Sequence, residues 1–141
     1  MPTRRTLLLA AACLSAATPL AAQTTPPRGS PLRAELMNAL RPTVEAEIGG
    51  QIEFVVTELR VMQQWAFASV QPQRPSGAPI DWRRTKFRED FANDTMSNLV
   101  LGLLIQEGAR WRVVEYVIGP TDVTWEEWIT KHRLPRRLFV D

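Results

Sequence analysis

Hydrophobic residues recur every four positions near the start of the main domain. The stripe is preceded by Ser30-Pro31, which supplies a hydroxyl N-cap and a proline at the first helical position. This spacing predicts one face of an amphipathic helix that ends at Gly49-Gly50, with apolar residues at Leu32, Leu36, Leu40, Val44 and Ile48. Because Pro42 removes a helical hydrogen bond and crowds the preceding turn, we expect a kink or a break near Leu40-Arg41.

After this helix, the periodicity changes to the alternation that is typical of strands. Segment 51–59 predicts a strand, with alternate apolar residues at Ile52, Phe54 and Val56. Segment 61–71 predicts a second strand, paired with the first through a turn near Met62–Gln64. That turn has no glycine or asparagine, so the sequence does not mark its position.

The second half of the chain contains another hairpin pattern after a long irregular stretch. Residues 72–79 are rich in proline and predict a loop, and the charged residues 80–96 are compatible with a short helix. Segments 98–106 and 110–118 then predict two strands joined around Glu107-Gly108. This is the strongest hairpin signal in the chain.

The C-terminal part predicts a short helix. Thr124 followed by Glu127 matches a capping box, and the helix is expected to run to about His132 before Leu134-Pro135 ends it. The predicted fold is therefore α+β, with an N-terminal helix packed on a four-stranded antiparallel sheet and a short C-terminal helix. In its simplest form this arrangement is cystatin-like or NTF2-like. The sequence contains no internal repeat.

The first 22 residues have the layout of an export signal. Arg4 and Arg5 form a basic start, Leu7–Leu14 form a short apolar run, and small residues lead to an expected cleavage after Ala22. The run is too short to span a bilayer, which disfavours an N-terminal anchor or a buried helix. Paired arginines occur in both twin-arginine and ordinary Sec signals, so the export route stays open. A lipoprotein signal has a leucine or a similar residue three positions before its cysteine, but the residue three before Cys13 is Ala10. We therefore do not expect lipidation.

Cleavage would divide the chain into a signal at 1–22, a polar, Pro-rich flexible tether at 23–29 and one domain at 30–141. The whole chain has 17 Lys and Arg against 15 Asp and Glu, and the signal holds two arginines and no acid. The mature chain therefore has 15 residues of each sign and no cysteine. Its neutral charge gives no support for a nucleic-acid partner, and no disulfide can staple it. We expect a periplasmic or secreted domain without a transmembrane helix in the mature chain.

Strand 110–118 carries mixed side chains on both predicted faces. Strict alternation gives two sets, with Trp111, Val113 and Glu115 on one face and Arg112, Val114 and Tyr116 on the other. We expect one face to lie under the N-terminal helix and the other to be partly covered. Trp125, Trp128 and Ile129 share one side of the short helix and are expected to pack on the sheet. The alternative is a stacking platform for a sugar or a peptide, which requires an exposed tryptophan.

The sequence contains no constellation typical of catalysis. His132 is the only histidine, so zinc would have to rely on one imidazole and carboxylates, and none of Ser69, Ser76 and Ser97 lies in a nucleophile elbow. No glycine-rich phosphate loop or dinucleotide fingerprint is present. We therefore expect no catalytic residue, metal or cofactor.

Asp122 lies between a Gly-Pro turn and a helix, where an aspartate most simply caps the helix or stabilises the turn. An NTF2-like enzyme would instead need a pocket between helix and sheet, with Asp122 or Glu115 as a base of raised pKa. The residues available to line such a pocket are Glu115, Asp122, Trp125 and Trp128.

The long loop is the second candidate binding surface. It interleaves cations and rings that can contact an anionic polymer, namely Trp82, Arg83, Arg84, Lys86, Phe87 and Arg88. Glu89, Asp90 and Asp94 follow at once and can neutralise these cations. The simpler interpretation is a solvated loop whose two rings insert into the fold.

Three stretches resemble small exported bacterial proteins of uncharacterised function. They are the WAF of residues 65–67, the WRVVEYVIGPTDVTWEEW of residues 111–128 and the LPRRLF of residues 134–139. The resemblance covers most of residues 30–140 and implies a compact secreted α+β domain. None of its motifs is catalytic, so it carries over no functional residue.

Three functional hypotheses follow from these observations. The first is a non-enzymatic exported domain that binds a protein or polymer of the cell envelope through residues 72–96 and the C-terminal segment 133–139. The second is the small NTF2-like enzyme described above. The third is an assembly factor that dimerises through an exposed face of the sheet. The sequence leaves the oligomeric state open.

Overall fold

A computed structural model describes residues 22–141, and most of the expected export signal lies outside this range. One antiparallel sheet holds four strands in the order β1-β2-β3-β4. Its strands and the two longer helices are α1 (Pro31–Ile48), β1 (Glu53–Met62), β2 (Trp65–Gln73), β3 (Val100–Glu107), β4 (Arg110–Ile118) and α3 (Trp125–His132). The shorter elements lie in the long loop and near the C-terminus: η1 (Trp82–Arg84), α2 (Arg88–Ala92) and η2 (Arg136–Leu138). The structure confirms the predicted α+β fold.

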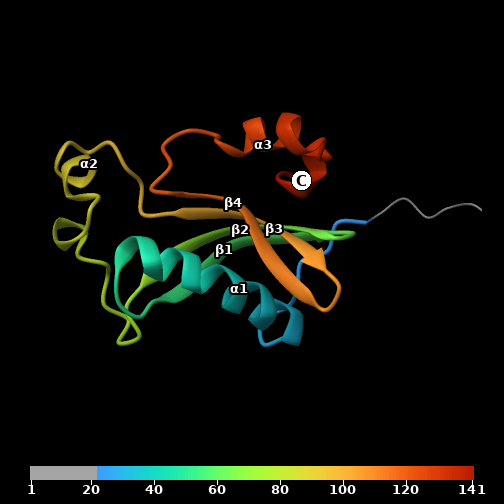
Figure 1. Cartoon of the computed structure of the whole chain (residues 1–141), viewed down its shortest axis with the longest axis horizontal. Helices are drawn as coiled ribbons and strands as arrows, with labels where there is room; N and C mark the ends of the chain where they lie inside the picture. The colour runs from blue at the N-terminus through green and yellow to red at the C-terminus, as the bar shows by residue number, and fades with distance from the viewer. Residues whose placement is uncertain (1–21) are drawn as a thin grey trace, which may run out of the picture.

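The sheet is the middle layer of three. α1 packs on one face, and α3 with the C-terminal segment packs on the other (Figure 1). The α1 side buries the larger apolar cluster, which includes Leu36, Leu40, Val44, Ala66, Val70 and Leu104. The α3 side buries a second cluster, which includes Phe67, Leu103, Trp128, Leu138 and Phe139. Among the described residues, no helix is both long and apolar enough to cross a bilayer.

α1 begins as the sequence predicts. The Ser30 hydroxyl accepts a hydrogen bond from the backbone N–H of Arg33 at 3.3 Å, and Gly49 ends the helix with a φ of 88°. Of the expected kink or break near Leu40-Arg41, the break is wrong, because α1 continues through Pro42 to Ile48, and the kink stays a prediction. Pro42 is exposed, and packing of the buried stripe on the other side of the helix offsets the lost hydrogen bond.

Two β-bulges determine which residues of the edge strands face each helix. Val114 is the extra residue in β4, because Leu104 pairs with Val113 while Leu103 pairs with Glu115. Before the bulge, Val113 faces α1, whereas after it Glu115 faces α3. The prediction that Trp111, Val113 and Glu115 share a face is therefore wrong. Thr57 is the corresponding extra residue in β1.

The two hairpins and the C-terminal helix lie close to their predicted positions. Gln63 adopts a φ of 52° in the turn between β1 and β2, a backbone region that most residues avoid. α3 begins after Thr124, but the predicted capping-box hydrogen bond is wrong. Thr124 already has helical backbone angles, and its side chain makes no cap bond.

The N-terminal segment and the C-terminus meet at β1. Thr24 forms an antiparallel bridge with Val61, with both backbone hydrogen bonds at 2.8 Å, and Pro26 is buried. The Gln23 side-chain amide donates a hydrogen bond to the carbonyl oxygen of Arg137. The segment expected to be a tether is therefore attached to the domain at Gln23, Thr24 and Pro26.

Candidate functional site

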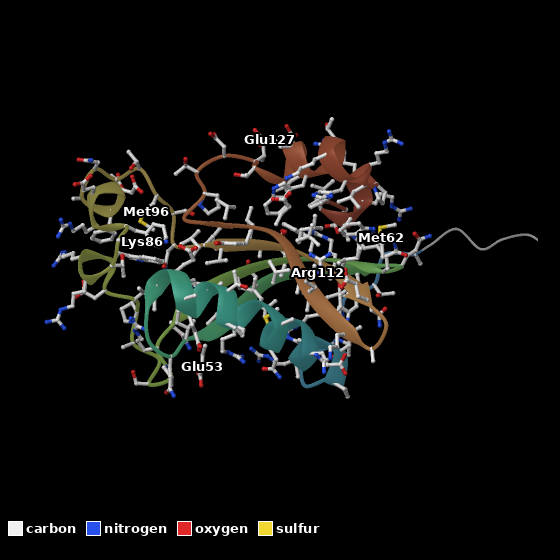
Figure 2. All side chains as sticks on the ribbon, viewed as in Figure 1. Glu53, Met62, Lys86, Met96, Arg112 and Glu127 are labelled. Atoms are coloured by element: carbon white, nitrogen blue, oxygen red, sulfur yellow. The ribbon has the colours of Figure 1, made fainter. Side chains whose placement is uncertain are left out.

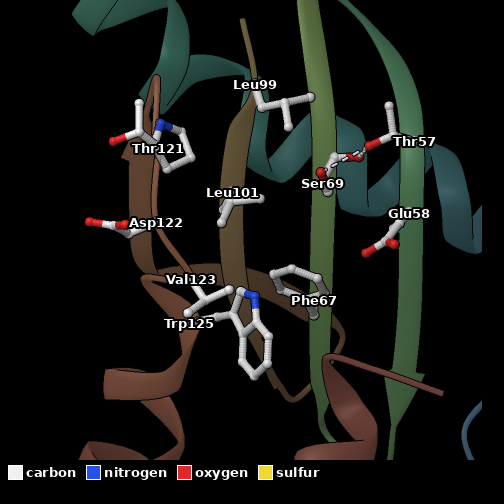
Figure 3. A pocket seen from close by; sticks show the side chains of 11 residues that line it. Thr57, Glu58, Phe67, Ser69, Leu99, Leu101, Thr121, Asp122, Val123 and Trp125 are labelled. Carbon is white, nitrogen blue, oxygen red and sulfur yellow. Dashed lines mark hydrogen bonds between the residues drawn. The ribbon is translucent and has the colours of Figure 1, made fainter. Parts of the chain in front are cut away.

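A cleft of about 670 Å³ opens on the α3 side of the sheet. Strands β1, β2 and β3 form its floor, and the segment between β4 and α3 forms the opposite wall (Figure 3). The lining residues are Thr57, Glu58, Phe67, Ser69, Leu99, Leu101, Pro120, Thr121, Asp122, Val123 and Trp125. The cleft exists because α3 and the C-terminal segment cover only part of this face.

The floor of the cleft is apolar except for the Glu58 carboxylate and one pair of hydroxyls. Leu99, Leu101 and Phe67 supply the apolar surface. The Thr57 hydroxyl lies 2.8 Å from the carbonyl oxygen of Ser69 and 2.9 Å from its hydroxyl oxygen. The bulge in β1 brings Thr57 to this face beside Ser69, so the irregularity of the strand creates the polar part of the floor.

Two carboxylates line the cleft, but they differ in direction. The Glu58 side chain turns toward Phe67, whereas the Asp122 side chain points away from the floor (Figure 3). Glu58 also forms an ion pair with Arg60, in which Oε2 of Glu58 lies 3.0 Å from Nη1 of Arg60. The two acids are therefore not arranged as a facing acid–base pair.

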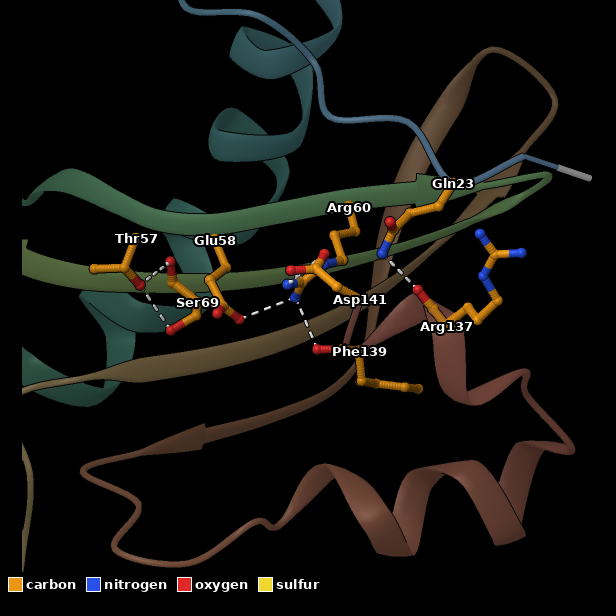
Figure 4. A network of polar contacts seen from close by, with 8 residues as sticks. All are labelled: Gln23, Thr57, Glu58, Arg60, Ser69, Arg137, Phe139 and Asp141. Carbon is orange, nitrogen blue, oxygen red and sulfur yellow. Dashed lines mark hydrogen bonds and ion pairs between the residues drawn. The ribbon is translucent and has the colours of Figure 1, made fainter.

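Arg60 links Glu58 of the cleft to the C-terminal residues of the chain (Figure 4). Its side chain is 11% exposed, and its Nη1 donates to the carbonyl oxygen of Phe139 at 2.7 Å as well as to Glu58. Its Nη2 lies 3.5 Å from Oδ1 of Asp141. A buried guanidinium needs such partners, because an unpaired buried charge is costly. Arg60 thus has a structural role that the sequence analysis did not identify.

No protein family, curated protein or solved structure matches this chain.

Glu115 does not line the cleft but fastens α3 to β4. Its Oε1 accepts hydrogen bonds from Nζ of Lys131 and from Nε2 of His132, which lies 3.0 Å away. The hydrogen bond from Lys131, followed by that from His132, holds the pKa of the Glu115 carboxyl below its ordinary value. A catalytic base would need a raised pKa, so the shift is opposite to the one expected for a base.

Glu115 makes the stability of the domain depend on pH. Because its pKa is lower in the folded state, its contribution is complete above the unfolded pKa and is lost as the pH falls through the folded pKa. We expect Glu115→Gln to lower the free energy of unfolding at pH 7 by about 1.5 kcal/mol. The difference from wild type should shrink below the ordinary carboxyl pKa of 4.5. Urea titrations across this pH range would measure it.

Glu107→Gln provides the matched control, because Glu107 also has a lowered pKa from its hydrogen bond with Arg112. Both side chains of that pair are more than half exposed at the hairpin tip, so solvent screens their interaction. A Glu115→Gln variant as stable as Glu107→Gln at pH 7 would contradict the assigned role.

The two tryptophans predicted as pocket candidates lie in different places: Trp125 lines the cleft, and Trp128 lies in the core. Trp125 lines the cleft and stacks on Phe139, with ring centroids 5.4 Å apart and an interplanar angle of 8°. Trp128 is only 4% exposed and belongs to the second apolar cluster. The predicted packing of this helix side on the sheet is therefore confirmed.

The rings of the long loop insert into the fold. Trp82 is 5% exposed, and its indole N–H donates to Oδ1 of Asn98 at 3.3 Å. Phe87 packs edge-on against Trp82, with ring centroids 5.8 Å apart. These contacts confirm the simpler interpretation of the two aromatic residues.

The cations of the loop have different environments. Lys86 forms an ion pair with Glu47 of α1, which also accepts a hydrogen bond from the Tyr116 hydroxyl at 2.6 Å. Figure 2 shows Lys86 at the α2 end of the sheet. Arg83 lies over the ring of Phe91, 5.8 Å from its centroid, while Arg84 and Arg88 are exposed. The loop thus presents its three arginines and Lys86 to solvent, whereas Trp82 is buried and Phe87 is half-buried.

The described residues contain no cluster of three or more His, Cys, Asp or Glu side chains that could hold a metal ion. Of the residues that line the cleft, Asp122 and Trp125 were predicted as pocket candidates, whereas Thr57, Glu58 and Ser69 were not. Thr57 and Glu58 occupy positions where regular alternation fails, and no motif marks them.

Proposed function

We propose that this protein is an exported, non-enzymatic binding domain that holds a segment of an envelope protein in the cleft. The observation that carries the proposal is the open cleft between β1–β3 and the segment 119–125, where Leu99, Val123 and Trp125 expose apolar surface. A folded domain normally buries apolar strand faces, and an open apolar hollow with a few polar groups is typical of a binding site. Export is supported by the sequence of residues 1–22.

Binding is better supported than catalysis. A general base must face its substrate and have a pKa suited to proton transfer. Asp122 points away from the floor, and the pKa of Glu115 is lowered. The space between α1 and the sheet is filled by the larger apolar cluster, where the NTF2-like enzyme would require a pocket. The single helix packed along an antiparallel sheet favours the cystatin-like description of the fold.

Photo-crosslinking in cells tests this proposal. A photoreactive residue would replace Val123, which is 55% exposed at the cleft, or Val55, which is 45% exposed on β1 and does not line the cleft. Both variants would carry the protein's own leader. We expect a crosslinked partner from position 123 and none from position 55, with the protein recovered outside the cytoplasm.

A second variant separates the cleft from the loop. Arg84→Ala with Arg88→Ala removes two exposed cations of the loop, and we expect the adduct at position 123 to remain. Loss of that adduct would favour the loop as the binding surface. Adducts at both valines, no adduct at position 123, a crosslink to a second copy of the chain or a cytoplasmic location would each contradict the proposal.

A further inference from the structure

The charged side chains that line the cleft are all acidic. Among the residues that the structure describes, the ionisable ones that line it are Glu58 and Asp122, and no lysine or arginine lines it. Acidic groups in a hollow attract cations and disfavour anions, and the low-dielectric apolar floor strengthens this preference. The charge of the cleft is therefore a restriction on its occupant.

Glu58 has capacity for a further partner. Its Oε2 binds Arg60, while its Oε1 has no hydrogen-bond partner among the described residues. The side chain is 48% exposed and turned toward the floor. Nη1 of Arg60 is shared between Oε2 of Glu58 and the carbonyl oxygen of Phe139. Glu58 can thus accept a second cation without losing its present contact.

Apolar and polar groups alternate over a short distance beside Glu58. Phe67 and Leu101 lie next to it on the floor, and the Thr57–Ser69 hydroxyl pair lies on its other side (Figure 3). An extended peptide presents the same mixture, because its amide groups need hydrogen-bond partners while its side chains alternate in direction. The open shape of the cleft also suits a chain that enters and leaves it.

We propose that the cleft binds an extended peptide segment with a lysine or arginine beside an aliphatic residue. The cation pairs with Oε1 of Glu58, and Asp122 at the rim adds to the attraction. The aliphatic side chain packs on Leu101 and on the exposed Val123, and the hydroxyl pair bonds to the peptide backbone. This inference rests on the proposed function and names the chemistry of the partner segment.

Selection from a library of short random peptides on the purified protein tests this chemistry. Backbone amide NMR shifts would identify the selected peptides that perturb the cleft residues. We expect those peptides to be enriched in Lys or Arg next to Leu, Ile or Val. Glu58→Gln with Asp122→Asn should weaken their binding about tenfold, and the effect should shrink at high salt.

The control variant, Glu53→Gln with Asp90→Asn, removes the same two charges from exposed positions outside the cleft. It should leave peptide affinity unchanged. Cleft-binding peptides without a cation, or equal weakening by both double variants, would overturn the inference and leave the proposed function intact. A library that yields no peptide at the cleft would overturn the inference, and the crosslink at position 123 would then decide the proposed function separately.

Discussion

Replacing Trp128 with alanine is expected to remove about 4 kcal/mol from the free energy of unfolding. Trp128 is 4% exposed and lies in the apolar cluster that joins α3 and the C-terminal segment to the sheet. It shares that cluster with Phe67, Leu103 and Phe139, each of which is at most 1% exposed. Truncation loses the burial of the ring and leaves a cavity that neighbours on a rigid sheet cannot close. Urea unfolding followed by circular dichroism would measure the change.

Glu127→Ala is the matched control for Trp128→Ala. Glu127 belongs to the same helix but is exposed, so its replacement should change the free energy of unfolding by less than about 0.5 kcal/mol. If Trp128→Ala were as mild as this control, the second apolar cluster would not contribute to the stability of the domain.

Leu40→Ala is expected to destabilise the domain by about 3 kcal/mol, because Leu40 is fully buried between α1 and the sheet. Gly102 of β3 lies directly under it. A Cβ atom built on Gly102 would lie 3.0 Å from Cδ1 and 3.3 Å from Cδ2 of Leu40. Gly102→Ala alone should therefore cost about 1–3 kcal/mol through overpacking.

The combination of Leu40→Ala and Gly102→Ala distinguishes this contact from two independent effects. The shorter side chain at position 40 leaves room for the added methyl group, so the double variant should lose less stability than the two single variants together. Chemical unfolding of the four proteins in this cycle would give the coupling. Additive losses would show that Leu40 does not limit the residue at position 102.

Much of the fold could be predicted because its elements carry strong local signals. The stripe of α1, the alternation in β1 and β2 and the glycine at Gly108 each mark an element within a short window. The wrong expectations arose where tertiary packing overrides a local rule. Pro42 is tolerated because the buried side of α1 holds the helix, and the bulge at Val114 reverses the predicted faces of β4.

The candidate site was less accessible to sequence reasoning. Asp122 and Trp125 could be identified because they follow a Gly-Pro turn and begin a helix. Glu58 and Ser69 lie in no recognisable sequence motif. The cleft joins three strands to a segment more than fifty positions along the chain from β1, so only the folded arrangement brings its residues together. The role of Arg60 depends in the same way on contacts with Phe139 and Asp141.

The meeting of the two ends of the described chain at β1 has a consequence for connectivity. Gln23 contacts Arg137, and Asp141 contacts Arg60, next to the residue that pairs with Thr24. Domains whose ends lie close together tolerate circular permutation. A short linker from Asp141 to Gln23, with new ends opened in the exposed turn around Gly77, would keep all four strands and their pairings. The order of elements along the chain is thus separable from their arrangement in space.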